Sequence, residues 1–327
     1  MNAWWLLLAL PAAAAVCWVK LERGWRPRQS TLDFWRLSPQ PWFKKVEGYV
    51  YGAASSSYLK PAGWRWFTRM WARSESAAGY HGKVLTGADA SRIVSLRQPL
   101  LATDLEHVIP YPRARSIILQ EPEPSLAVLE CPCRAQKADA CQPRDVCLVV
   151  GEPFVSFAVD HQPDKARRIS RSEALAIIEA EERRGHIHTA WFKDAMHDRF
   201  YAICNCCSCC CLGMESYRRG VPRLAHSGYR PLFDADTCTT CGVCRSLCPF
   251  AALEQDQSGM PVLSDERCMG CGLCVSHCPT GAVVLVLAPE RGIPLDVERL
   301  AARPAGSYSS PVSEAAGTSS SASELMQ

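Results

Sequence analysis

One cysteine pattern occurs twice in this chain and restricts its fold more than any other feature. In each copy, three cysteines are separated by two residues, and a fourth follows three residues later, directly before a proline. The first copy contains Cys238, Cys241, Cys244 and Cys248, and the second contains Cys268, Cys271, Cys274 and Cys278. A glycine, a proline and an alanine recur at the same offset of thirty residues, so the two copies form an internal repeat.

This spacing is typical of chains that hold two iron–sulfur clusters. Three thiolates from one tight turn reach three corners of a cubane, and the fourth is carried to the neighbouring cube. We therefore expect one [4Fe–4S] cluster to take Cys238, Cys241, Cys244 and Cys278, and the other to take Cys268, Cys271, Cys274 and Cys248. A pair of zinc sites is the alternative, but zinc usually takes two separated cysteine pairs rather than a triple followed by Cys-Pro.

Length and charge indicate two or three folding units with different surroundings. The chain has 327 residues and a formal net charge of +3, but this charge is unevenly distributed. Residues 20–83 carry twelve Lys/Arg and four Asp/Glu, whereas residues 229–288 carry three Arg and six acidic residues. The two parts are therefore expected to meet different partners. Nineteen cysteines would also suit a secreted disulfide scaffold, but the cluster spacing favours a reducing compartment.

The N-terminal segment predicts a membrane anchor. Residues 3–19 are uncharged and mostly apolar, and a helix of this length spans about 25 Å, the short limit for a bilayer. Tryptophans flank the segment, and basic residues follow it, which predicts an uncleaved anchor with the remainder in the cytoplasm. A cleaved signal peptide would have a positively charged residue before the apolar run, and this segment has none. A buried or interfacial helix is the remaining alternative.

The segment 61–73 is a second candidate for membrane contact. Helical spacing places Trp64, Phe67 and Trp71 on one face, and the arginines of the segment on the opposite face. This pattern is typical of an interfacial helix beside anionic lipid, and an ordinary surface helix fits it equally well.

Residues 80–224 predict a mixed α/β domain. Short strands are expected at 116–120 and 126–130, separated by a Glu/Pro breaker. The best predicted helix is 171–184, where Ser170 and Glu173 have capping-box spacing, and the alternating segment 186–192 follows as a strand.

Ten further cysteines lie in this middle domain. Six cysteines within eight residues cannot all face one core, so a metal or cluster site is predicted, with either iron–sulfur or zinc as the cofactor. The candidate ligands are Cys204, Cys206, Cys207, Cys209, Cys210 and Cys211, together with Cys131, Cys133, Cys141 and Cys147. Their spacing leaves open whether they bind separate centres, share one, or supply a redox-active dithiol. The nearby His186, His188 and His197 are expected to form hydrogen bonds rather than to bind metal.

Residues 236–285 resemble the bacterial two-cluster ferredoxin domain, with every cysteine and both prolines in place. This resemblance implies two pseudo-symmetric halves, each with a β-hairpin and a helix, which enclose two [4Fe–4S] clusters and pass single electrons. The longer stretch 80–288 is similar to a group of bacterial 4Fe–4S dicluster proteins, and that similarity implies no particular substrate.

The sequence as a whole predicts an α+β protein. The expected parts are a membrane anchor (1–28), a basic aromatic-rich juxtamembrane region (29–79), the cysteine-rich domain (80–224), the ferredoxin-type domain (225–290) and a low-complexity tail (291–327). The predicted function is membrane-associated electron transfer between redox proteins, and no nucleic-acid partner is expected. A reductase centred on the middle cysteines is the first alternative and a redox sensor the second; a component of an oxidoreductase is favoured over a stand-alone enzyme.

Overall fold

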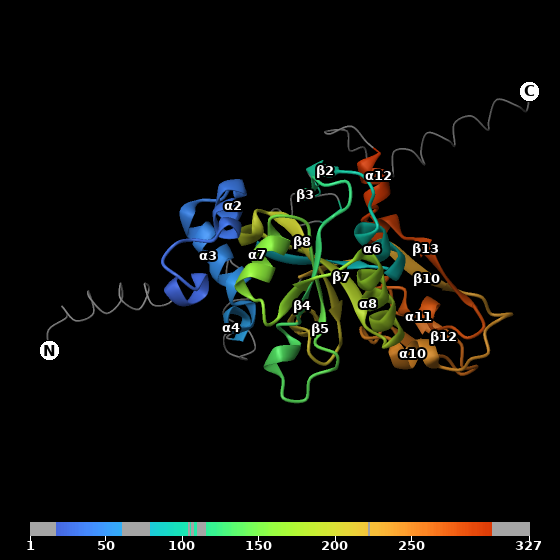
Figure 1. The fold of residues 1–327 in the computed structure, drawn as a ribbon. Helices are drawn as coiled ribbons and strands as arrows, with labels where there is room; N and C mark the ends of the chain where they lie inside the picture. The colour runs from blue at the N-terminus through green and yellow to red at the C-terminus, as the bar shows by residue number, and fades with distance from the viewer. Residues whose placement is uncertain are drawn as a thin grey trace, which may run out of the picture.

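The computed structural model describes residues 18–60, 79–103, 105, 108–109, 116–221 and 223–302. Its centre is a nine-stranded sheet with helices on both faces, and a smaller lobe formed by the cysteine repeat lies beside it (Figure 1). The α+β expectation is therefore confirmed at the level of a mixed fold of sheets and helices.

The large sheet has the order β6-β4-β5-β8-β7-β1-β9, and β2 joins it through β3, which pairs with β8. Pairing is antiparallel except for β1 with β9 and β3 with β8. The strands are β1 (Tyr80–Leu85), β2 (Leu100–Thr103), β3 (Ser116–Leu119), β4 (Leu126–Glu130), β5 (Asp145–Val150), β6 (Ala166–Arg168), β7 (Ile187–Lys193), β8 (Arg199–Cys206) and β9 (Leu224–Ala225).

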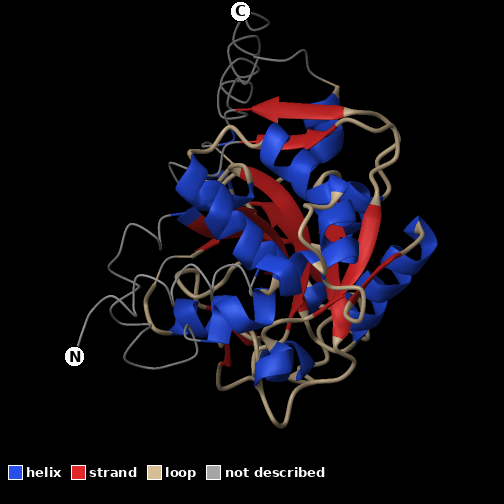
Figure 2. Cartoon of the chain, turned by 60° about the vertical axis from the view of Figure 1, so that its left-hand side comes forward, coloured by secondary structure: helices blue, strands red, loops and turns tan. Residues whose placement is uncertain are grey.

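Two cores cover the two faces of this sheet, because alternate side chains of a strand point in opposite directions. On β7, Trp191 joins a core rich in aromatics and cysteines, whereas Phe192 joins an aliphatic core. The first core is covered by α2 (Gln29–Leu37), α3 (Trp42–Ala53), α4 (Ser55–Leu59) and α7 (Phe154–His161), and the second by α6 (Gly87–Val94), α8 (Arg171–Arg183) and α12 (Val297–Ala301). Figure 2 shows the strands between these helices.

The predicted elements of the middle domain are present. The predicted strands correspond to β3, β4 and β7, and the predicted helix to α8. The hydroxyl of Ser170 accepts a hydrogen bond from the backbone N–H of Glu173 at 3.2 Å, which is the expected N-cap.

Helices from the segments before and after the middle domain contribute to its two cores. Helices α2–α4, placed by sequence in a juxtamembrane region, pack Phe34, Tyr49 and Tyr51 into the aromatic core. Helix α12, placed by sequence in the tail, buries Val297 in the aliphatic core. Sequence periodicity of such short helices does not reveal which surface covers their apolar side chains.

The predicted membrane contacts lie almost wholly outside the described residues. Only the last two residues of the predicted anchor 3–19 are described, and none of the segment 61–73. Within the described ranges, no helix combines the length and apolar character needed to cross a bilayer.

The secondary structure of the smaller lobe reflects the internal repeat of its sequence. Strand β10 (Tyr229–Phe233) pairs with β13 (Val283–Leu287), and β11 (Leu253–Gln255) pairs with β12 (Pro261–Leu263), both antiparallel. Helices α10 (Val243–Leu247) and α11 (Leu273–Ser276) lie between these strands in sequence. Each small sheet thus joins one strand from each half of the repeat, which interlocks the two halves.

A buried lysine connects the lobe to the large sheet. Lys83 on β1 is fully buried, and its ammonium donates to the backbone carbonyls of His226 and Ile293, on either side of the repeat. Buried polar groups need such partners to offset their desolvation, so these bonds hold the lobe against the sheet.

Candidate metal centres

The eight cysteines of the repeat line two adjoining cavities. The first is lined by Cys238, Cys241, Cys244 and Cys278. The second is lined by Cys248, Cys268, Cys271 and Cys274, with Cys244 also at its edge. These are the two sets named by the crossed-ligand prediction, and the assignment of ligands to clusters stays a prediction.

Backbone geometry repeats around the two cavities. Gly242 and Gly272 precede α10 and α11 with positive φ angles of 72° and 88°, a conformation that favours glycine. The fourth cysteines are also equivalent, because the backbone N–H of Ala252 donates to the sulfur of Cys248 at 3.3 Å and that of Ala282 donates to the sulfur of Cys278. Such N–H groups stabilise sulfur ligands and tune cluster potential.

The two cavities differ in burial. Burial raises the pKa of the Cys274 thiol to about 12 and also raises the pKa of Cys271. For Cys278, burial also acts to raise the pKa, but hydrogen bonds from Thr280 and nearby backbone N–H groups outweigh it and lower the pKa. Cys241 is exposed. The first cavity is therefore the more accessible one, and metal binding in the second must displace protons from buried thiols.

The second cavity is the one that adjoins the middle domain. Phe250, which lines it, makes an edge contact with Tyr217 of α9 (Leu212–Arg218), with ring centroids 5.4 Å apart. Helix α11 packs on α8, where the His277 ring lies 3.3 Å from the carbonyl oxygen of Arg183. The first cavity thus lies further from the large sheet.

The ten middle cysteines separate into two groups. In the first group, all four sulfurs lie within 4.8 Å of one another, and the group is only partly buried. The Cys141 and Cys209 sulfurs are 2.9 Å apart, which joins the loop after β4 to the turn after β8. This four-cysteine site consists of Cys141, Cys207, Cys209 and Cys210.

The other six cysteines form a closed ring in which each thiol contacts two neighbours. Following the contacts, the order is Cys131, Cys133, Cys211, Cys206, Cys204 and Cys147, and the last contacts the first. The Cys206 and Cys211 sulfurs are 3.2 Å apart. All six line one cavity of about 100 Å³, which Cys207 of the four-cysteine site also lines. We call this group the six-cysteine ring.

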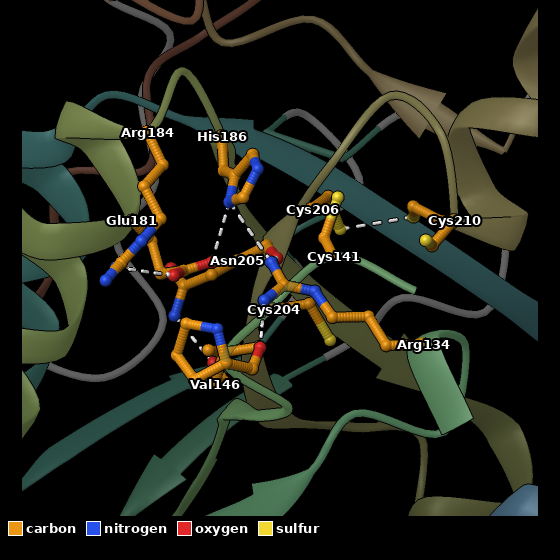
Figure 3. A network of polar contacts seen from close by, with 12 residues as sticks. Arg134, Cys141, Val146, Glu181, Arg184, His186, Cys204, Asn205, Cys206 and Cys210 are labelled. Carbon is orange, nitrogen blue, oxygen red and sulfur yellow. Dashed lines mark hydrogen bonds and ion pairs between the residues drawn. The ribbon is translucent and has the colours of Figure 1, made fainter. Parts of the chain in front are cut away.

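A buried cation lies beside both groups (Figure 3). Arg134 immediately follows the ring residue Cys133, and its guanidinium contacts Glu181 of α8 at 2.5 Å, with both side chains almost completely buried. It also donates to the backbone carbonyl of Asn205 at 3.2 Å, between Cys204 and Cys206. Burial acts to raise the pKa of Glu181, but hydrogen bonds from His186 and Arg134 outweigh it and lower the pKa. Arg134 therefore links the two cysteine-bearing segments to α8.

Two of the three nearby histidines form the hydrogen bonds expected of them. The His186 ring lies 2.7 Å from a Glu181 carboxylate oxygen, and the His188 ring lies 2.6 Å from the Asn205 side-chain oxygen. His197 is buried and packs on Phe34 at a centroid distance of 4.5 Å. None of the three belongs to the close four-cysteine group.

Sequence reasoning missed two features of the ring. Arg134 was visible beside Cys133, but nothing in the sequence indicated its burial against a helix that begins 37 residues later. Tyr51 and Tyr201 also line the cavity, with their hydroxyls 2.7 Å apart, although they are 150 residues apart in sequence. Only the folded sheet brings α3 and β8 together.

Comparison with known families identifies one segment of the chain. The family model of the 4Fe-4S dicluster domain matches residues 230–279, which contain all eight cysteines of the repeat. No curated protein matches the chain. The four-cysteine site and the six-cysteine ring lie outside the matched residues.

Proposed function

We propose, from the 4Fe-4S dicluster domain at residues 230–279, that this chain is a membrane-associated electron-transfer protein carrying two [4Fe–4S] clusters. The observation that carries the proposal is the distribution of eight cysteines over two adjoining cavities, four thiols for each. Four thiolates are the ligand set of a cubane. Cys238, Cys241, Cys244 and Cys278 would hold the first cluster, and Cys248, Cys268, Cys271 and Cys274 the second.

The clusters supply the one-electron chemistry, and the protein controls their environment. The N–H groups of Ala252 and Ala282 donate to the sulfurs of the crossing cysteines. The second cavity is more buried than the first, and burial, together with such hydrogen bonds, sets reduction potential. We therefore expect two sites of unequal potential.

The arrangement favours a direction for electron transfer. The first cavity is the accessible one, in an acidic lobe suited to a basic face of a redox partner. The second cavity adjoins the middle domain through Phe250 and Tyr217. Electrons would thus pass between an external protein and the cysteine-rich domain through the two clusters in turn.

A further metal centre belongs to this proposal. The sulfurs of the four-cysteine site lie within 4.8 Å of one another. Tetrahedral zinc–thiolate bonds of about 2.3 Å place sulfurs at comparable separations. This site suits a single ion that fastens the turn after β8 to the loop holding Cys141.

A reductase centred on the six-cysteine ring is the second candidate. The hydroxyls of Tyr51 and Tyr201 at the ring cavity favour it, because a reductive step on a bound molecule needs proton donors as well as electrons. In this alternative, the ferredoxin-type lobe serves as an internal electron path.

The carrier function predicts reversible one-electron cycling. Protein purified and reduced anaerobically, then freed of reductant, should deliver at least about two electrons per chain to a one-electron acceptor such as cytochrome c. A Cys241→Ala/Cys271→Ala variant should deliver fewer, because it removes one ligand of each cluster. Full-length protein that takes up no electrons from a strong reductant would refute electron transfer as its function.

Membrane association predicts a strong effect of removing residues 1–19. Most of the truncated protein should be lost from the membrane fraction, and it should keep its ferredoxin-type clusters. Residual binding through the basic segment 61–73 should decrease with added salt, because ions screen charge over about 10 Å at 0.1 M. We place the remainder of the chain in the cytoplasm on the basic residues that follow the segment. Full-length protein entirely in the soluble fraction at low salt would contradict the anchor.

A further inference from the structure

The six-cysteine ring offers more thiols than a cubane uses. A [4Fe–4S] cluster takes four cysteines, one for each iron. All six ring thiols are in contact with ring neighbours and line one cavity, so no four of them stand apart as a set. A single cubane in this cavity would leave two thiols buried beside it without a metal.

The spacing of the ring sulfurs does not suit a single ion. Among the described residues, mutual separation within 4.8 Å occurs only for the four-cysteine site. The ring thiols contact their neighbours, but no three of them converge on one point. The eight cysteines of the repeat likewise form no such close group. The ring therefore lacks the compact arrangement of the four-cysteine site, although neighbouring thiols within it are in contact.

The cavity that the ring lines is also larger than the two cavities of the repeat. Its free volume is about 100 Å³, compared with about 20 Å³ in each of the others. The volumes of the repeat cavities can be used for comparison, because the cysteine spacing around them is that of cubane ligands. The cavity that the ring lines, which extends beyond the thiols to Tyr51 and Leu59, thus has several times the free volume of a repeat cavity.

Rigid elements and a buried cation support the ring. Cys147 lies on β5, and Cys204 and Cys206 lie on β8, so half of the thiols are fixed by the central sheet. Cys131 directly follows β4, and Cys211 directly precedes α9. The guanidinium of Arg134 lies beside these segments, where its positive charge offsets that of thiolates.

From these observations we propose that the six-cysteine ring holds an iron–sulfur cluster of more than four irons, with Cys131, Cys133, Cys147, Cys204, Cys206 and Cys211 as its ligands. Two cubanes joined through one bridging sulfide match this set. Each cubane gives one iron to the bridge and keeps three irons for cysteine, so six thiolates complete the assembly. The inference rests on the proposed electron-transfer function, in which this cluster receives electrons from the second site of the lobe.

The test counts irons in full-length protein whose four-cysteine site has been removed by Cys141→Ser/Cys209→Ser. Native mass spectrometry of the most highly loaded anaerobic species, with chemical iron and sulfide analysis, should give about sixteen irons per chain, about eight of them from the repeat. About twelve irons would mean a cubane in the ring, and about eight an iron-free ring. Either result overturns the proposal.

A second variant locates the extra irons. Adding Cys147→Ala/Cys204→Ala to the same background should reduce the count to about eight while the EPR signal of the repeat clusters is retained. An unchanged count would place the extra irons elsewhere and refute the ring as their site. If this variant does not fold, the count in the first background still decides. Absence of the repeat clusters from the unmodified protein would instead refute the proposed function.

Discussion

In a chain that lacks the first cluster, Cys248→Ser is expected to abolish the remaining ferredoxin-type cluster, whereas Cys278→Ser should leave it intact. The background is Cys238→Ser/Cys241→Ser, which removes two ligands of the first site. Cys248 lines the second cavity although it belongs to the first copy of the repeat, and Cys278 lines the first cavity. The expected loss is a whole cluster, about four irons per chain.

The reciprocal background makes the test symmetrical. In a Cys268→Ser/Cys271→Ser chain, Cys278→Ser should remove the remaining cluster and Cys248→Ser should not. EPR of the reduced proteins, together with iron analysis, reads out each combination. If each fourth cysteine matters only to the cluster of its own copy, the crossed arrangement is wrong.

Replacing the buried arginine should cost the middle domain much of its stability. Arg134→Met removes the fully buried partner of Glu181 and leaves its carboxylate with His186 and the half-exposed Arg184, so the cost is expected to reach about 3 kcal/mol, the lower end for a broken buried pair. It also removes the donor that joins the Cys133 segment to the backbone between Cys204 and Cys206. The urea midpoint of the anaerobic protein should fall accordingly.

Two further variants separate this effect from a general loss of charge. Arg167→Met removes an exposed ion pair with Glu173 and should cost less than about 1 kcal/mol. The double variant Arg134→Met/Glu181→Leu should recover part of the loss, because the buried carboxylate that lost this partner is then removed as well. A midpoint for Arg134→Met equal to that of Arg167→Met would show that the buried pair does not stabilise the domain.

The local elements of the middle domain could be predicted from sequence because their signals are local. The Ser170 cap and the alternation around His188 specify α8 and β7 without reference to the rest of the fold. The repeat was equally clear, since fixed cysteine spacing reports directly on ligand geometry. Its cavities group the cysteines in the sets expected for crossed ligands.

The division of the ten middle cysteines could not be predicted, because it depends on strand pairing over long distances. Cys204 and Cys206 project from one face of β8 toward Cys147 on β5, whereas Cys207, Cys209 and Cys210 follow the end of the strand and turn toward Cys141. The spacing of the six cysteines from 204 to 211 left open whether they share one centre or belong to separate ones. The sheet assigns three of these cysteines to each group.

Two [4Fe–4S] clusters in the repeat that carry single electrons should be detectable by EPR after reduction with dithionite. The measurement uses protein in which Cys147→Ala/Cys204→Ala disables the ring and Cys141→Ser/Cys209→Ser disables the four-cysteine site. We predict about two spins per chain, with splitting from magnetic coupling between neighbouring clusters, and about eight irons and eight sulfides. Folded protein that contains zinc and no sulfide in the repeat, and shows no EPR signal on reduction, would contradict it.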